Sequence, residues 1–198
     1  MPDIRALPTG LHVLLAMALL AMTLAWHVPM MLWDHLDLVP LLEAARNGNL
    51  GATRLLEIHG GHLHAAAYLV LLVTTTVSGG QPWLDCMVSW TLLLATALLV
   101  RSLSRESFLT HSPRDPCVAT LLALLALHPG HLANLQWGWQ VAVFLCLAGV
   151  LTCIHQLTRA RLDGKRLVVA LAAAGMACLG RASRCWYWPY SLSPMACT

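Results

Sequence analysis

Five long stretches without a single Asp, Glu, Lys or Arg constrain the fold of this chain more than any other feature. They cover residues 6–33, 64–83, 86–100, 117–158 and 167–180. A membrane-spanning helix needs about 20 mostly apolar residues, so most of these stretches are long enough to cross a bilayer. The stretch 117–158 can cross twice if it breaks near His128-Pro129-Gly130. The sequence therefore predicts an all-α, polytopic transmembrane helix bundle whose main partner is the lipid bilayer.

The low content of charged residues also supports a membrane protein. Charged residues make up 11% of the 198-residue chain, against roughly 25% in a typical soluble domain. The formal net charge of +3 concerns the orientation of loops, and we expect no nucleic acid partner. We interpret 6–33 as an uncleaved anchor, because it exceeds the usual apolar core of a signal peptide, about 7–15 residues, and further spans follow.

Two topologies are consistent with the basic residues. Segments 101–114 and 159–166 hold three and four Lys or Arg, which predicts that both are cytoplasmic. If every apolar stretch crosses once, the segment with Asp34 and Asp37 is cytoplasmic too. If 64–79, which three Thr interrupt, only dips into the bilayer or lies flat, that segment faces outside together with 128–137. We favour the second topology, since it leaves few basic residues outside.

The chain divides into one transmembrane domain, residues 1–180, and an atypical tail, residues 181–198. The tail packs two Trp, two Tyr, two Pro and two Cys into 18 residues. Our hypothesis is that it is an out-of-frame or truncated end, and that the chain is the N-terminal part of a longer protein. The seven cysteines are scattered and indicate no disulfide framework.

An amphipathic juxtamembrane segment follows the first apolar stretch. Its pieces 38–46 and 50–59 flank Asn47-Gly48-Asn49, a strong turn signal. Leucines gather on one side of each piece and charges on the others, which predicts two short amphipathic helices on the bilayer surface.

Two carboxylates open this segment. Asp34 and Asp37 lie three residues apart, so a helical turn places them on one face. There they can hold a divalent metal or take separate acid and base roles, because proximity raises one pKa. Alternatively, they are solvated residues that mark the end of a span.

Two histidine pairs share the pattern H-x-G-H-L. They are His59 with His62 and His128 with His131. Imidazoles at this spacing can bind zinc or copper. However, neither pair has the glutamate of a metalloprotease motif, and Gly or Pro between the histidines disfavours a rigid helical ligand face.

Amides and tryptophans gather in "HPGHLANLQWGWQ", residues 128–140. Trp137 and Trp139 fit an aromatic belt at the headgroup level. Gln140 begins an apolar helix, so its amide needs a polar partner or a polar cavity. Together with Asn134 it predicts a pocket that contacts a sugar or a phosphate.

Taken together, these motifs resemble a group of bacterial multi-span proteins related to the GT-C glycosyltransferases, which use lipid-phosphate-linked sugars. That group has a DxDxxP-like end of the first span, then HNEHR, and later SPxQWENxxWGFQ. Here "DHLDLVP", "HGGHL" and "HPGHLANLQWGWQ" occupy these places, covering most of residues 30–157. The matching residues of the second and third motifs are His59, His62, Pro129, Asn134, Trp137, Gly138 and Gln140. Gly60-Gly61, Leu63 and Ala133 replace the group's Asn-Glu, Arg and Glu.

The resemblance implies a function at the outer face of a bacterial cytoplasmic membrane. By it, Asp37 is the base that activates an acceptor hydroxyl and Asp34 is its partner, or helps to bind a divalent metal. His59, His62, Asn134, Trp137 and Gln140 would bind a polyprenyl-phosphate-linked sugar. Such enzymes are much longer than this chain, so activity of the chain alone stays open. The alternative is a non-enzymatic membrane protein, either a structural bundle or a metal-handling transporter that uses the histidine pairs.

Overall fold

The computed structural model describes residues 6–31, 33–59, 62–107, 115–159 and 162–183. This part of the chain is all-α apart from one small three-stranded sheet. Its longer helices are α1 (Ala6–Trp26), α4 (Ala65–Val77), α5 (Trp83–Ser107), α6 (Asp115–Ala126), α8 (Val141–Leu157) and α9 (Gly164–Arg181). The short helices are η1 (Trp33–Leu38), α2 (Val39–Arg46), α3 (Ala52–Leu55), η2 (Pro129–His131), α7 (Leu132–Gln136) and η3 (Gly138–Gln140), and the strands are β1 (Ile58–His59), β2 (His62–Leu63) and β3 (Ala182–Ser183).

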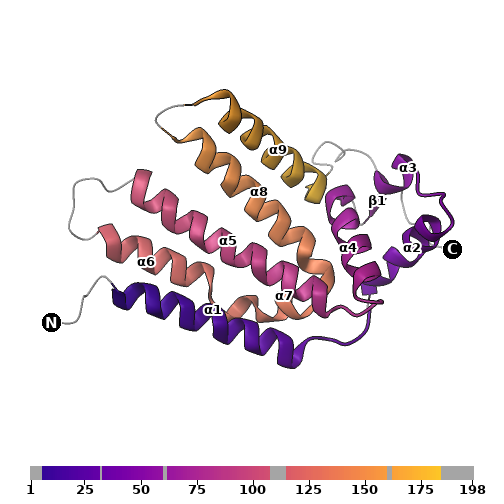
Figure 1. Ribbon diagram of the computed structural model, residues 1–198, viewed down its shortest axis with the longest axis horizontal. Coiled ribbons are helices and arrows are strands. Elements are labelled where there is room, and N and C mark those ends of the chain that lie inside the picture. Colours follow the sequence, from indigo (N-terminus) through magenta and orange to yellow (C-terminus); the bar gives the residue numbers. More distant parts are fainter. Residues whose placement is uncertain (1–5, 32, 60–61, 108–114, 160–161, 184–198) are drawn as a thin grey trace, which may run out of the picture.

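Five helices form a slab along the long axis of the molecule. Figure 1 shows α1, α6, α5, α8 and α9 side by side, with α4 running across one end of the slab near α2 and α3. Helix α5 contacts α1, α6 and α8, and α8 also packs on α9. In chain order, α1, α5, α6, α8 and α9 run alternately in opposite directions, so the connections between α1 and α5 and between α6 and α8 lie at the same end.

Two buried apolar clusters hold the slab together. One joins α1, α5 and α8 in the middle of the molecule and consists of Ala16, Leu19, Leu93, Ala97, Leu127, Leu135 and Phe144. The other lies at the end where α4 crosses, and consists of Leu38, Leu41, Ala67, Tyr68, Leu71, Leu72, Trp139, Val141 and Ala142. This second cluster fixes η1 and α2 against α4 and the start of α8.

Two helices are long and apolar enough to cross a membrane. They are Trp83–Ser104 and Gly138–Leu157, and only 33% of the apolar window of each is buried inside the molecule. Large apolar side chains also face outward on other helices, including Leu14, Val73, Val168 and Leu171. The 13 residues of α4 rise only about 20 Å at 1.5 Å per residue, too short for a bilayer core of about 30 Å.

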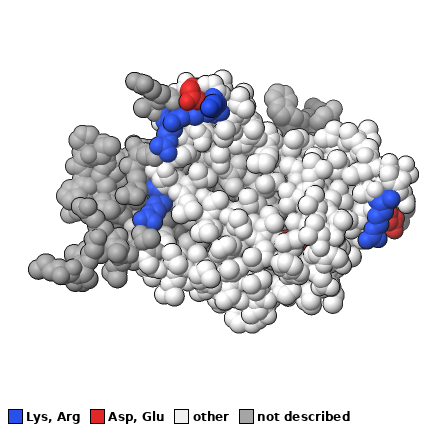
Figure 2. Space-filling view, in the orientation of Figure 1, with Lys and Arg blue, Asp and Glu red and all other residues white. Residues whose placement is uncertain are grey.

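Charged side chains lie at the two ends of the slab. On the face shown in Figure 2, Lys and Arg gather at the end that holds the α8–α9 connection and again at the opposite end, with a broad uncharged zone between them. Among the described residues, Arg159, Lys165 and Arg166 surround the α8–α9 connection, and Arg46 and Arg54 belong to α2 and α3. On this face, Lys, Arg, Asp and Glu are therefore concentrated at the two ends.

Small residues let α8 and α9 approach closely. A Cβ placed on Gly149 of α8 would lie 2.7 Å from the carbonyl oxygen of Ala173 and 3.1 Å from the Cβ of Ala177, both on α9. Ala173 and Ala177 are buried. Such small-residue contacts are typical of helix pairs in membranes, where close backbone approach replaces hydrophobic burial as the source of packing energy.

The structure refines the predicted elements. The expected break in 117–158 is confirmed, although it is longer than predicted, because η2, α7 and η3 all lie between α6 and α8. The helix predicted at 38–46 is confirmed as α2. The one predicted at 50–59 is wrong: α3 ends at Leu55, and Ile58 and His59 pair with Leu63 and His62 in an antiparallel hairpin. Strand β3, directly after α9, pairs with β2, a tertiary contact that the local pattern could not reveal. Of the atypical tail, residues 184–198 lie outside the described part.

Candidate functional site

The candidate site lies where α4 crosses the slab, and the three motifs of the sequence meet there. Helix η1 carries Asp34 and Asp37, β1 and β2 carry the histidine motif, and η3 carries the end of the tryptophan motif. Helix η1 contacts both α4 and η3, and β2 contacts α9. Segments that are far apart in the sequence therefore build one end of the molecule.

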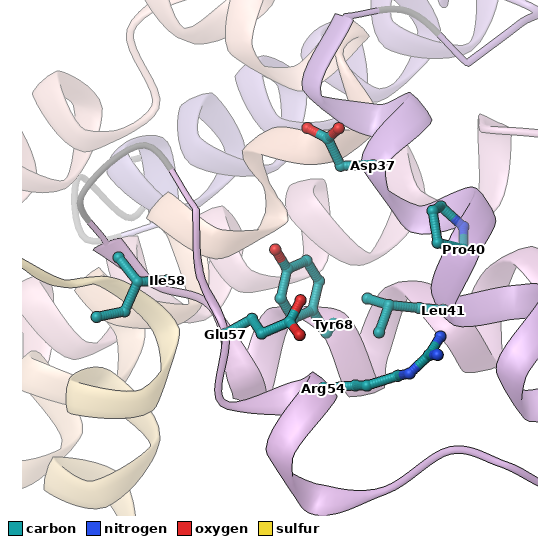
Figure 3. Close-up of a pocket in the computed structure, with 7 residues that line it drawn as sticks. All are labelled: Asp37, Pro40, Leu41, Arg54, Glu57, Ile58 and Tyr68. Carbon is teal, nitrogen blue, oxygen red and sulfur yellow. The ribbon is translucent and has the colours of Figure 1, made fainter.

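A polar cavity opens at this end. It has a volume of about 320 Å³ and is lined by Asp37, Pro40, Leu41, Arg54, Glu57, Ile58 and Tyr68. Figure 3 shows how these side chains come from η1 and α2, from the α3 region and from α4. Two carboxylates, one guanidinium and one phenol at a single cavity provide both hydrogen-bond donors and acceptors for a polar ligand.

Tyr68 forms the floor of the cavity. Its side chain is 4% exposed, and burial is the main cause that raises its pKa above the usual value of 10.0, followed by the negative charges of Asp37, Glu57 and Asp34. The phenol therefore keeps its proton at neutral pH and can donate a hydrogen bond. Behind it, the ring of Trp139 lies 5.8 Å from the Tyr68 ring and 5.5 Å from that of His64, so the tryptophan motif supports the cavity wall.

Helix α2 separates this cavity from a second one. The first is lined by Asp37, Pro40 and Leu41, while Val39, Leu42, Glu43 and Arg46 line the second, also of about 320 Å³, with residues from the end of α4. The spacing of the second set places it on one helical face, and the first set lies on the opposite side. Glu43 and Arg46 are thus charged residues of the same helix that do not reach the Asp37 cavity.

A buried ionisable pair lies directly beneath the motifs. His35 of η1 and Asp85 in the first turn of α5 are each 1% exposed, and the His35 Nε2 and Asp85 Oδ2 atoms are 3.4 Å apart. The hydroxyl of Thr74 on α4 donates a short hydrogen bond to the other carboxylate oxygen, Asp85 Oδ1. Neither Asp85 Oδ2 nor His35 Nε2 has a hydrogen-bond partner among the described residues. Three helices are thus linked through one carboxylate.

Gly138 closes over this pair. A Cβ at Gly138 would lie 2.8 Å from Asp85 Cβ, 3.0 Å from His35 Cε1 and 3.1 Å from Asp85 Oδ2. Real side chains do not approach so closely, so only glycine lets η3 lie on the pair. The glycine of the Trp-Gly-Trp motif therefore has a packing role that its sequence context alone did not reveal.

The residues predicted for the site lie in different surroundings. Asp37 lines the polar cavity, and Asp34 lies half-buried on the same short helix. His62 is half-buried, and its ring lies 5.9 Å from that of His64. His59 pairs with His62 through the backbone, and the side chain of His59 lies outside the described part. The remaining predicted residues do not line the cavity: Asn134 is exposed on α7, and Trp137 and Gln140 are half-buried.

Metal binding finds little support in the described residues. Among them, no three His, Cys, Asp or Glu side chains come close enough to hold a metal ion. His128 Nδ1 accepts a hydrogen bond from the backbone N–H of Gly130 at 3.0 Å, so this nitrogen caps its own turn. The ring of His131 packs edge-on against Phe144, with centroids 6.1 Å apart.

Several side chains at the site were absent from the predicted set. Arg54, Glu57 and Tyr68 come together only through the packing of α3 on α4, and nothing in their spacing indicates it. Asp85 had a signal: it is the one acidic residue between positions 64 and 100, and an ionisable group inside an apolar stretch is by default a functional candidate.

Comparison with protein families, with curated proteins and with solved structures found no match for this chain. Its function must therefore be inferred from the site itself.

Proposed function

We propose that the chain is a multi-pass integral membrane protein whose uncharged middle zone lies in the hydrocarbon core. A core helix of a soluble protein would be mostly buried, whereas α5 and α8 bury only 33% of their apolar windows. The outward-facing leucines and valines of α1, α4 and α9 and the charge-free band (Figure 2) support the same conclusion, because large exposed apolar surfaces mark contact with lipid or protein.

Orientation follows from the basic residues. The α8–α9 connection carries Arg159, Lys165 and Arg166, and Arg101 lies near the same end on α5. The positive-inside rule places this end in the cytoplasm. The end with α4 and the candidate site then faces outside, the periplasmic side if the membrane is a bacterial inner membrane. Helix α4 does not cross in this topology; it runs across the end of the slab (Figure 1).

For the site we propose transfer of a sugar from a polyprenyl-phosphate donor to an acceptor hydroxyl. The observation that carries this proposal is the Asp37 carboxylate at a cavity that also holds Arg54 and Tyr68 (Figure 3). Asp37 accepts the proton of the acceptor hydroxyl as a general base. As the acceptor oxygen bonds to C1 of the sugar, the C1–O bond to the lipid phosphate breaks and the polyprenyl phosphate leaves. The Arg54 guanidinium binds the oxygens of this phosphate, and the Tyr68 phenol donates a hydrogen bond to the sugar or phosphate.

The other predicted residues take a smaller part. Asp34 shares η1 with Asp37, where its carboxylate is placed to orient the acceptor beside the base. Direct substrate contacts by His59, His62, Asn134, Trp137 and Gln140 remain predictions. Of these residues, the four whose side chains are described do not line the cavity, and the side chain of His59 lies outside the described part.

Transfer assays on matched variants test this proposal. Membranes containing the protein are incubated with a panel of radiolabelled polyprenyl-phosphate monosaccharides, and label leaving the lipid fraction is counted. Asp37→Asn should lower the turnover by about 10²- to 10⁴-fold, the usual contribution of a general base. Arg54→Gln should mainly raise the KM for the donor, because it removes a phosphate contact.

Glu43→Gln and Arg46→Gln are the matched controls, since both lie on the opposite face of α2, and each should retain near-normal transfer. Equal transfer by wild type and Asp37→Asn would remove the catalytic role. No transfer from any donor by the wild-type chain would favour a non-enzymatic bundle.

A further inference from the structure

The His35–Asp85 pair is buried at the junction of four segments, and the proposed chemistry does not use it. His35 comes from η1 and Asp85 from α5, Thr74 of α4 hydrogen-bonds the carboxylate, and Gly138 of η3 covers it. We infer that this pair is a positioning device: it fixes η1 against α5 and so sets where the Asp37 carboxylate lies in the polar cavity. The catalytic consequence rests on the proposed function, whereas the structural part does not.

Helix η1 needs such an anchor. It is a six-residue 3-10 helix whose buried residues are His35 and Leu38, and 3-10 hydrogen bonds have poorer geometry than those of an α-helix. Leu38 packs into the apolar cluster at this end, which fixes one point of η1. The contact of His35 with Asp85 gives η1 a second buried contact, which opposes rotation of the short helix about its axis.

Asp37 lies between these two anchors. It follows His35 by two residues and precedes Leu38, and its side chain is exposed to the cavity. Because His35 and Leu38 are both buried, the backbone of Asp37 is fixed before and after it in the sequence. A general base must remain within hydrogen-bond reach of its proton donor, and small misplacements of reacting groups are costly, so movement of η1 reduces turnover even when the donor still binds.

The His35–Asp85 pair suits a positioning role because the loss of either partner is costly. A buried ion pair contributes little to stability relative to apolar packing, yet removal of one partner leaves an uncompensated polar group in the interior. Thr74 adds a hydrogen bond to the carboxylate, which helps to orient Asp85. The interaction thus selects a geometry more than it stabilises the fold.

Hydrogen–deuterium exchange tests the structural part without any assay of activity. Full-length wild type and Asp85→Asn are compared in nanodiscs; the asparagine keeps an oxygen for Thr74 but lacks the charge. We expect faster exchange in peptides from 33–46, and unchanged exchange in α8 and α9, because only η1 loses an anchor. Gly138→Ala, whose Cβ would push η3 off the pair, should reproduce this local pattern if Asp85→Asn fails to fold.

Ser89→Ala is the matched control. Ser89 lies one turn further along α5, is fully buried, and its hydroxyl has no hydrogen-bond partner among the described residues. It should leave exchange in 33–46 unchanged. Two results would overturn the inference. In the first, residues 33–46 exchange at the wild-type rate in both Asp85→Asn and Gly138→Ala. In the second, exchange increases evenly over the whole molecule.

Kinetics test the catalytic part. Asp85→Asn should lower kcat at least tenfold and leave the donor KM within about twofold, because the cavity remains but its base is displaced. Combined with Asp37→Asn, it should cause no further loss, since both changes remove the same contribution. Local opening of η1 with normal kcat would refute positioning while leaving the proposed function intact, whereas an inactive wild type would refute the function while leaving the exchange result intact.

Discussion

The ring of Trp33 meets the ring of Trp137 edge to face, with centroids 5.5 Å apart and an interplanar angle of 88°. Trp33 adopts a left-handed backbone conformation with φ of 50°, which is uncommon for a residue other than glycine. This conformation begins η1 and directs the chain toward the tryptophan motif. The contact ties the start of the acidic motif to η3, next to Gly138 and the buried pair.

A double-mutant cycle measures this contact. Trp33→Ala and Trp137→Ala are combined, and unfolding is followed in detergent. Edge-to-face aromatic pairs contribute about 0.5–1.5 kcal/mol beyond area burial, so we expect a coupling energy in that range. Additive effects of the two substitutions would show that the motifs do not interact through these rings. The pair Trp26→Ala and Trp137→Ala serves as a control for loss of exposed tryptophan.

Accessibility labelling tests the membrane topology. Single cysteines replace Asn49, Ala133 and Gly164 in a cysteine-free background, and intact cells are treated with an impermeant maleimide. Cysteines at 49 and 133 should react from outside, and the one at 164 only after permeabilisation, because it lies at the basic end. Labelling of 49 and 133 from opposite sides would separate the acidic and tryptophan motifs and remove the shared site.

Substitution of Gly149 tests the packing of α8 on α9. Gly149→Ala places a methyl group 2.7 Å from a backbone oxygen of α9, and the helices must separate to accommodate it. Overpacking of this kind typically costs about 1–3 kcal/mol, which thermal unfolding in detergent can measure. Gly175→Ala is the matched control, because nothing lies within 4 Å of the added methyl group; it should be neutral or slightly stabilising. Equal effects at the two positions would contradict the packing described for α8 and α9.

His131 gives the stability a pH dependence. Burial, and then the neighbouring charge of His128, lower its pKa below the usual value of 6.5. The folded state thus favours the neutral ring, so this contribution is complete above pH 6.5 and is lost as the pH falls through the unfolded pKa toward the folded one. His131→Phe should reduce the drop in melting temperature between pH 7.5 and 5, whereas His27→Gln should not. An unchanged drop in His131→Phe would contradict this assignment.

The apolar periodicity and the turn signals predicted most of the helices, because these depend on local sequence. Helix α2 and the break after α6 follow from the amphipathic pattern and from Pro and Gly. The hairpin of β1 and β2 could not be predicted from these local signals. Ile58 and His59 are extended, and they pair with Leu63 and His62 across two glycines. The pairing of β2 with β3, which is distant in the sequence, stabilises this hairpin.

The candidate site was predictable only in part. Asp37 was identified from its place after the first apolar stretch, and the structure puts it at a polar cavity. The partners of the cavity, Arg54 and Tyr68, depend on how α3 folds back on α4, which no motif encodes. Asp85 was absent from the predicted site, although a lone carboxylate between apolar stretches requires a partner.

The order of the segments around Asp85 bears on how the chain is made. Both groups that contact the carboxylate, His35 and Thr74, precede it in the sequence, and Gly138 follows it. In a chain inserted into the bilayer during synthesis, both polar partners of Asp85 leave the ribosome before the carboxylate. The two polar partners of Asp85 are therefore made before α5, and the glycine that covers the pair is made after it.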